Sequence, residues 1–90
     1  MSSALYMRVT PTPPKEYWCF QQPIKGIIAR KYYDHDGSCG GDLRTLSSND
    51  LPWLEGVLSA ISVDEKERKE FEAMVEIIRD GGTVDMWFEN

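Results

Sequence analysis

The segment from Asp34 to Cys39 gathers an imidazole, a thiol and two carboxylates within six residues. Transition metals bind these groups in proteins, so His35, Cys39 and a carboxylate, with Cys19 elsewhere in the chain, form a candidate metal- or redox-responsive site. Structural zinc sites use four ligands, usually in paired spacings, whereas this chain has one histidine and two cysteines in all. We therefore favour a solvated turn whose aspartates bond local backbone groups, and we expect no metal and no cofactor.

The same segment partly matches two further motifs but differs from each of them at positions that the motif requires. Counted as an EF-hand calcium loop from Asp34, position 6 is Cys39 instead of glycine and position 12 is Thr45 instead of glutamate. The Asp-x-Asp-Gly-Ser string is similar to the nucleophile motif of haloacid-dehalogenase-type phosphatases, but residues 30–33 before it are not a buried apolar strand. No phosphate-binding loop, nucleophile elbow or zinc-protease helix motif is present. The sequence predicts a protein that is not an enzyme and has no catalytic residue.

The net charge and its distribution favour some of the remaining candidate functions over others. Ten basic and fifteen acidic residues give a net charge of −5, and residues 46–90 hold eleven of the acidic ones. This balance makes nucleic acid an unfavoured ligand, because nucleic-acid binding usually needs a basic surface, and it favours a protein partner with a basic surface. Nucleic acid stays the alternative because basic and aromatic residues, which could contact phosphates and stack on bases, gather on one expected hairpin. These residues are Lys25, Arg30, Lys31, Tyr32, Tyr33 and Arg44.

Aromatic residues are more numerous than a small core can hold, with three Trp, four Tyr and three Phe among ninety residues. Trp87 alternates with the apolar residues of its expected strand, and Trp18 alternates with Tyr17 and Cys19. Surplus tryptophans are favoured anchors of protein interfaces, including those of a homodimer. The alternative is that both faces of the sheet are partly covered, one by helices and the other by the proline-rich segment. Three glutamates lie on one flank of an expected helix, well away from its apolar stripe, and Ile77 lies beyond them, as in an interface with a charged rim. The alternative is that the neighbouring helix covers Ile77 and the glutamates are solvated surface. The candidate protein-binding residues are therefore Glu65, Glu72, Glu76, Ile77, Trp87 and Trp18.

Five strands are predicted to position these side chains. Alternation with period two indicates the first and last of them, and β-branched or aromatic composition indicates the others. The segment Asp34–Asp42 supplies the glycines that a hairpin turn needs. The expected strands are 5–10, 17–20, 24–34, 43–46 and 83–89.

Two helices are predicted between the last two strands. The first has N-cap residues within 47–50 and a proline in its first turn. The second begins with a capping box from Ser62 to Glu65 and ends at Gly81-Gly82. Apolar residues at helical spacing on both helices should pack on one face of the sheet. The expected core includes Ile28, Leu54, Leu58, Ile61, Phe71, Met74, Val75, Ile78, Val84, Met86 and Phe88.

The element order predicts one α+β domain over residues 1–90, with a helix pair on one face of a mostly antiparallel sheet of four to five strands, in the order ββββααβ. Residues 1–4 are expected to be flexible, and residues 11–15 are a proline-rich connector. No stretch is long and apolar enough for a membrane helix, and the start of the chain lacks an export signal, so we expect a cytoplasmic protein with no membrane contact. The favoured function is a small acidic protein-binding domain, of the kind that phages and mobile elements use to occlude or mimic a surface of a host protein.

Overall fold

Residues 4–10 and 17–89 are described in the computed structural model, and they form seven main elements in the order ββαβααβ. The strands are β1 (Ala4–Thr10), β2 (Trp18–Phe20), β3 (Gly41–Leu46) and β4 (Thr83–Glu89). The helices are α1 (Ile24–Tyr32), α2 (Leu51–Ala60) and α3 (Glu65–Arg79), with a short 3-10 turn (Ser48–Asp50) before α2. The α+β class, the antiparallel sheet and the helix pair are confirmed.

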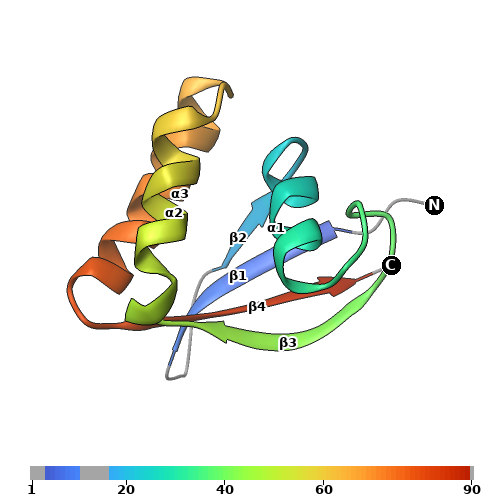
Figure 1. The fold of residues 1–90 in the computed structure, drawn as a ribbon, viewed down its shortest axis with the longest axis horizontal. Coiled ribbons are helices and arrows are strands. Elements are labelled where there is room, and N and C mark those ends of the chain that lie inside the picture. Colours follow the sequence, from blue (N-terminus) through green and yellow to red (C-terminus); the bar gives the residue numbers. More distant parts are fainter. Residues whose placement is uncertain (1–3, 11–16, 90) are drawn as a thin grey trace.

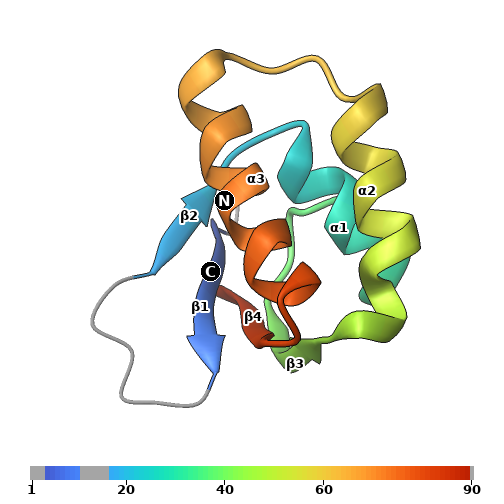
Figure 2. The ribbon, with the colours of Figure 1, turned by 90° about the vertical axis from the view of Figure 1, so that its left-hand side faces the viewer.

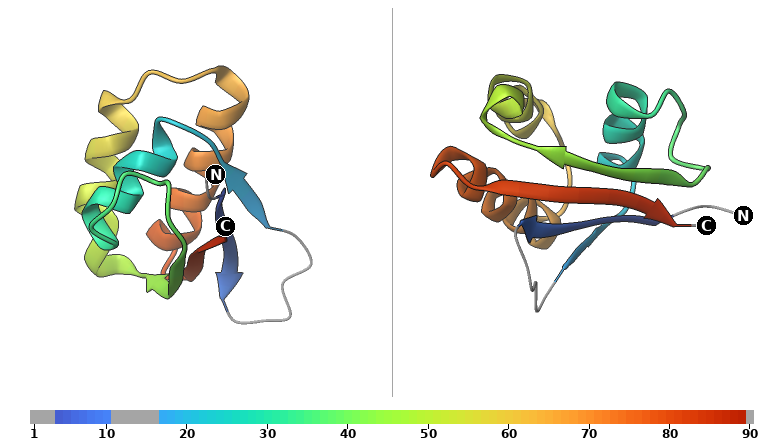
Figure 3. Two further views of the ribbon diagram at one scale, coloured as in Figure 1. Left: turned by 90° about the vertical axis from the view of Figure 1, so that its right-hand side faces the viewer. Right: turned by 90° about the horizontal axis from the view of Figure 1, so that it is seen from below.

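The four strands form a single antiparallel sheet in the order β2-β1-β4-β3 (Figure 1). The central pair is β1 and β4, which are matched along their whole length from Ala4 opposite Glu89 to Thr10 opposite Thr83. All three helices lie on one side of this sheet, and in the view from below the strands are seen without a helix in front of them (Figure 3). One face of the sheet is therefore left open by the described part of the chain.

Residues 24–34 are the element for which the sequence-based expectation is wrong. They form helix α1 and its C-terminal turn, not a strand, so the expected hairpin with residues 43–46 is absent. Ile24, Ile28 and Tyr32 are four residues apart, and the two isoleucines are fully buried. This helical stripe packs against the sheet, and the resulting burial outweighs the β-propensity of isoleucine and tyrosine.

The helix pair is formed by α2 and α3, which run antiparallel side by side (Figure 2). The N-cap of α3 is Asp64, whose Oδ1 accepts a hydrogen bond from the Glu67 backbone N–H at 2.8 Å. The expected box from Ser62 is therefore wrong by two residues, since the aspartate offers the same type of cap closer to the helix. Gly81, with φ of +94°, ends the helix in the left-handed conformation, as expected.

The hydrophobic core lies between the sheet and the three helices. Nine of the eleven expected core residues are buried, whereas Leu58 and Ile61 are half-buried and pack against this core. Leu5, Met7 and Phe20 complete the sheet side of the core. The buried members of the expected set are Ile28, Leu54, Phe71, Met74, Val75, Ile78, Val84, Met86 and Phe88.

Two expectations concern the ends and connections of the chain. Ala4, the last of the residues expected to be flexible, is the first residue of β1, and residues 1–3 and the connector 11–15 lie outside the described residues.

Within the residues that the structure describes, no helix is long and apolar enough to span a membrane.

Candidate protein-binding surfaces

Aromatic side chains cover the open face of the sheet. Tyr6 of β1 stacks on Trp87 of β4, with ring centroids 5.6 Å apart and planes inclined by 22°. Tyr17, which precedes β2, meets Tyr6 edge to face at 5.3 Å and is 63% exposed. Arg8 lies beside them, with its guanidinium carbon 5.0 Å from the Trp87 ring centroid. These four residues are called the aromatic sheet face below.

Arg8 brings a positive charge to this face, next to the Asp85 carboxylate. Its Nε lies 4.0 Å from the Asp85 carboxylate, too far for a hydrogen bond, and Nε has no hydrogen-bond partner among the described residues. Asp85 is instead bonded by Thr45, whose Oγ1 donates to Oδ1 at 2.9 Å. The guanidinium is therefore held over an aromatic ring and near a carboxylate, with its Nε atom buried.

The two tryptophans expected as anchors lie on opposite faces of the sheet. Trp87 belongs to the aromatic sheet face, where it is half-buried by Tyr6 and Arg8. Trp18 pairs with Met7 on the helix side of the sheet and packs against the core. Because Met7 and Phe20 are fully buried on that side, Trp18 supports the core and does not form one surface with Trp87.

The glutamates expected to form an acidic surface on α3 are exposed but locally neutralised. Glu65 is paired with Lys69 at 3.3 Å, Glu72 with Arg68 at 3.6 Å and Glu76 with Arg79 at 3.0 Å. Such pairs within one helix are typical of a solvated face. Ile77 beside them is half-buried and packs against the core. This helix lies on the side of the sheet opposite Trp87, so the six expected residues do not form one continuous surface.

The expected basic hairpin does not exist, and its residues are distributed over α1 and β3. Lys25 is buried, whereas Arg30 and Lys31 are exposed. Tyr33 is held by hydrogen bonds from its hydroxyl to the Asp42 and Met86 carbonyl oxygens, at 2.7 and 3.3 Å. Arg44 lies over the Tyr33 ring, 4.9 Å from its centroid. Because its ring is packed between protein groups, Tyr33 is not available to stack on a base.

Tyr32 is likewise committed to the protein. Its hydroxyl donates a hydrogen bond to Asp50 Oδ1 at 2.8 Å, and its ring meets Trp53 edge to face at 5.5 Å. Burial, followed by the hydrogen bond and the charge of Asp50, raises the pKa of Tyr32 well above its usual value. Tyr32 therefore connects α1 to the start of α2.

This raised pKa predicts alkaline destabilisation that depends on Tyr32. The unfolded chain loses the phenol proton near pH 10, whereas the folded protein retains it to higher pH. The free energy of unfolding should thus fall as pH rises above about 10. In Tyr32→Phe the fall should be smaller, with about 1–2 kcal/mol lost at neutral pH from the missing hydrogen bond. Urea unfolding at several pH values measures both effects, and equal alkaline slopes in the two proteins would contradict this account.

The loop between α1 and β3 contains the residues expected to form a solvated turn. Asp36 Oδ1 accepts hydrogen bonds from the backbone N–H and the hydroxyl of Ser38. These bonds, with a smaller contribution from Arg30, lower the pKa of Asp36. The Nδ1 atom of His35 accepts from the Gly37 N–H at 2.9 Å, while its Nε2 is buried. The local aspartate bonds are confirmed, but the turn leads from a helix to a strand and not between two strands.

The metal- or redox-responsive alternative has little geometric support in the described residues. No group of three or more His, Cys, Asp or Glu side chains that could hold a metal lies together among them. Cys19 and Cys39 are both free and exposed. Partial desolvation and the Glu67 carboxylate raise the pKa of the Cys19 thiol, which lowers the fraction of reactive thiolate at neutral pH.

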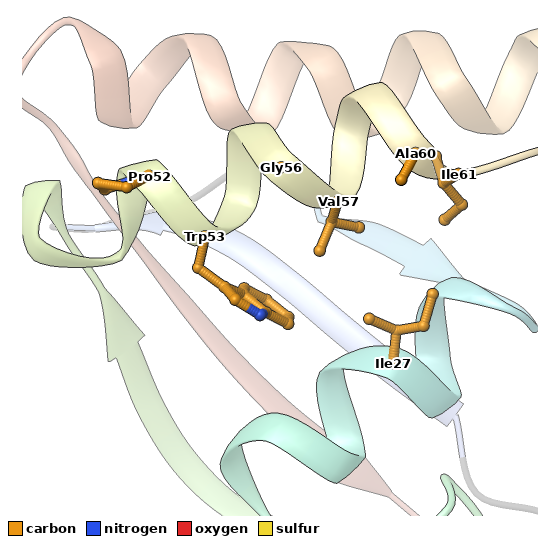
Figure 4. Close-up of a pocket in the computed structure, with 7 residues that line it drawn as sticks. All are labelled: Ile27, Pro52, Trp53, Gly56, Val57, Ala60 and Ile61. Atoms are coloured by element: carbon orange, nitrogen blue, oxygen red, sulfur yellow. The ribbon is translucent and has the colours of Figure 1, made fainter.

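A second apolar surface lies between α1 and α2 (Figure 4). It is a groove of about 450 Å³ in which Ile27 of α1 faces Val57 and the indole of Trp53 on α2. Its lining contains no charged residue. The residues of this α1–α2 groove are Ile27, Pro52, Trp53, Gly56, Val57, Ala60 and Ile61.

Sequence patterns contained part of the signal for both surfaces. Alternation in β1 and β4 places Tyr6, Arg8 and Trp87 opposite the core residues, but their contact depends on the pairing of these two distant strands. The groove was missed because it requires α1 to be a helix. Its signal was the four-residue spacing of Ile24 and Ile28, with Ile27 on a different side.

Comparison with known proteins adds no relative from which a function could be inferred. No protein-family model, curated protein or solved structure matches this chain.

Proposed function

We propose that this chain is a small, non-enzymatic protein-binding domain that contacts its partner through the aromatic sheet face. The supporting observation is that Tyr6, Tyr17 and Trp87 form a continuous group of rings on a face that the described helices leave open. Large aromatic side chains provide much contact area at a small cost in conformational entropy, and Trp, Tyr and Arg are the residue types most enriched in binding hot spots.

The charge of the chain indicates the type of partner. A net charge of −5 favours association with a basic protein surface through long-range attraction. Because the α3 glutamates are paired with basic neighbours, we expect them to contribute to this long-range attraction and not to direct contacts with the partner. We include in the proposal a cytoplasmic inhibitor or accessory role, in which the domain occludes or mimics a surface of a host protein, as small acidic proteins of phages and mobile elements do.

A second candidate ligand for the same face is single-stranded nucleic acid. The near-parallel stacking of Tyr6 on Trp87 and the adjacent Arg8 resemble the combination of rings and cations on which unpaired bases stack. This differs from the expected basic hairpin in its residues and in the face it uses. The net negative charge opposes it, so we rank it below protein binding.

The first test identifies the partner and asks whether its binding requires the aromatic sheet face. Proteins captured from the native cell by the immobilised wild-type domain are compared with those captured by Trp87→Ala and Tyr17→Ala, and the dissociation constant is then measured with the purified partner. We expect Trp87→Ala to weaken binding by about tenfold or more, mainly through faster dissociation. Tyr17→Ala keeps the test informative if Trp87→Ala lowers stability, because substitution of an exposed residue usually changes stability by less than about 0.5 kcal/mol.

Two further arms separate the alternatives. The double reversal Glu72→Lys/Glu76→Lys should slow association with a basic partner without changing the dissociation rate. A labelled 20-nucleotide single strand should not bind at physiological salt. Binding of that strand that Trp87→Ala abolishes would support the nucleic-acid candidate and overturn protein binding, and partner binding unaffected by both aromatic variants would show that another surface is used.

A further inference from the structure

The α1–α2 groove has the dimensions of a site for a helix. Its α2 wall extends from Pro52 to Ile61, which is about 15 Å at 1.5 Å per residue and matches roughly three turns of a partner helix. Apolar residues spaced by three and four positions on an amphipathic helix fill grooves of this kind. Trp53, which lines the groove, belongs to the residue types enriched in interface hot spots.

The shape of the α2 wall allows close approach of another backbone. Pro52, Gly56 and Ala60 follow one another at intervals of four residues and carry no long side chain. A Cβ atom built on Gly56 would meet nothing within 4 Å, so the space above this position is free. Ile27 of α1 lies on the opposite side of the groove, and Trp53 and Val57 point from α2 toward it (Figure 4).

Charge at the rim indicates which helix would fit. Lys31 of α1 extends over the groove, with Nζ 5.5 Å from the Trp53 ring centroid. Arg30 precedes it and is three residues after Ile27, so helical spacing places both cations on the groove side of α1. Neither forms an ion pair among the described residues, whereas Lys66, Arg68, Lys69 and Arg79 on α3 are all paired. A ligand that buries apolar residues here would meet the positive charge of Lys31 and, beside it, that of Arg30, which also acts on Asp36.

We propose that the α1–α2 groove is a second binding site, which accepts an amphipathic helix of a partner protein with acidic residues along one edge. The acidic edge pairs with Arg30 and Lys31, and the apolar side packs on Trp53, Val57 and Ile27. This site lies on the helix side of the sheet, away from the aromatic sheet face, so it does not depend on the function proposed for that face.

The test uses two synthetic 15-residue peptides and a groove-filling variant. Both peptides carry leucines at positions i, i+3, i+4 and i+7 and alanine or glutamine elsewhere, except at three positions along one edge of the helix, which are glutamate in one peptide and lysine in the other. The indole signals of the ¹⁵N-labelled domain report binding, and we expect saturable shifts at Trp53 but not at Trp87 for the glutamate peptide. The lysine peptide should bind about tenfold more weakly, and Arg30→Glu/Lys31→Glu should remove this preference.

Gly56→Leu blocks the groove without disturbing the fold. The Cβ atom of the new side chain would meet nothing within 4 Å, and leucine is a better helix former than glycine, so we expect the variant to be at least as stable as the wild type. It should lower the affinity for the glutamate peptide by about tenfold or more. The matched control is Ser59→Leu, which adds the same side chain at an exposed position of α2 outside the groove lining and should leave binding unchanged.

Four results would overturn the proposal. These are the absence of saturable binding up to about 1 mM peptide, equal affinity for the two peptides, equal effects of Gly56→Leu and Ser59→Leu, and a wild-type dimer that Gly56→Leu dissociates. The last result would assign the groove to a second copy of the chain. Binding of a small apolar dye without binding of either peptide falls under the first result and would indicate a small-molecule site.

Discussion

Replacement of Phe71 by alanine should lower the free energy of unfolding by about 3–5 kcal/mol. Phe71 is fully buried on α3 and meets Phe20 of β2 edge to face, with ring centroids 5.8 Å apart. The substitution removes most of a side chain from the interface between the helix pair and the sheet, and it leaves a cavity there. Since small domains have total stabilities of about 5–15 kcal/mol, part of the protein could be unfolded at 37 °C.

Urea unfolding measures this effect, with Glu72→Ala as the matched control on the same helix. Glu72 is exposed and paired only with Arg68, so its loss should change stability by about 0.5 kcal/mol or less. If both variants unfolded at the wild-type urea concentration, the packing of α3 on the sheet would be wrong.

Replacement of Gly41 by alanine should cost about 1–3 kcal/mol through overpacking. A Cβ atom at this position would lie 2.6 Å from Cδ1 of the Tyr33 ring. That ring cannot easily move, because its hydroxyl bonds the Asp42 carbonyl oxygen and its edge packs on Phe88 at a centroid distance of 5.0 Å. The close approach of β3 to α1 therefore requires glycine at residue 41.

A double-mutant cycle tests this mechanism. In a Tyr33→Ala background the obstructing ring is gone, and Gly41→Ala should then change the free energy of unfolding by much less than in the wild type. An equal cost in both backgrounds would mean that the substitution acts on the β3 strand itself and not through Tyr33.

Local patterns predicted most of the elements, and their failures have identifiable physical causes. The alternation in residues 5–10 and 83–89 and the stripe from Phe71 to Ile78 were sufficient to predict these elements. Each element has one buried and one solvent-exposed side, and the sequence pattern shows it. In residues 24–34, β-branched and aromatic composition favoured a strand, whereas the four-residue spacing of Ile24 and Ile28 indicated the helix that forms. Here the spacing of the apolar residues indicated the secondary structure better than the β-propensity of the residues did.

The candidate surfaces were less predictable because they depend on contacts between distant segments. Trp87 was correctly placed on the outer side of its strand, but its contacts with Tyr6 and Arg8 require β1 and β4 to be neighbours. Trp18 could not be assigned to a face, since a strand of three residues is too short for alternation to show which side is buried. Whether either tryptophan binds a partner stays a prediction.

The pairing of β1 with β4 also has a consequence for how the chain folds. The two central strands are separated by 72 residues between Thr10 and Thr83, so the middle of the sheet consists of contacts with high sequence separation. Closing so long a loop slows folding relative to a domain built from local contacts. During synthesis, β1 and β3 cannot be joined in one sheet until residues 83–89 have left the ribosome, because β4 is the strand that pairs with both. A fragment that ends before Thr83 lacks the strand that joins the two halves of the sheet, and it exposes Leu5, Met7 and Leu46 to the solvent and to other chains.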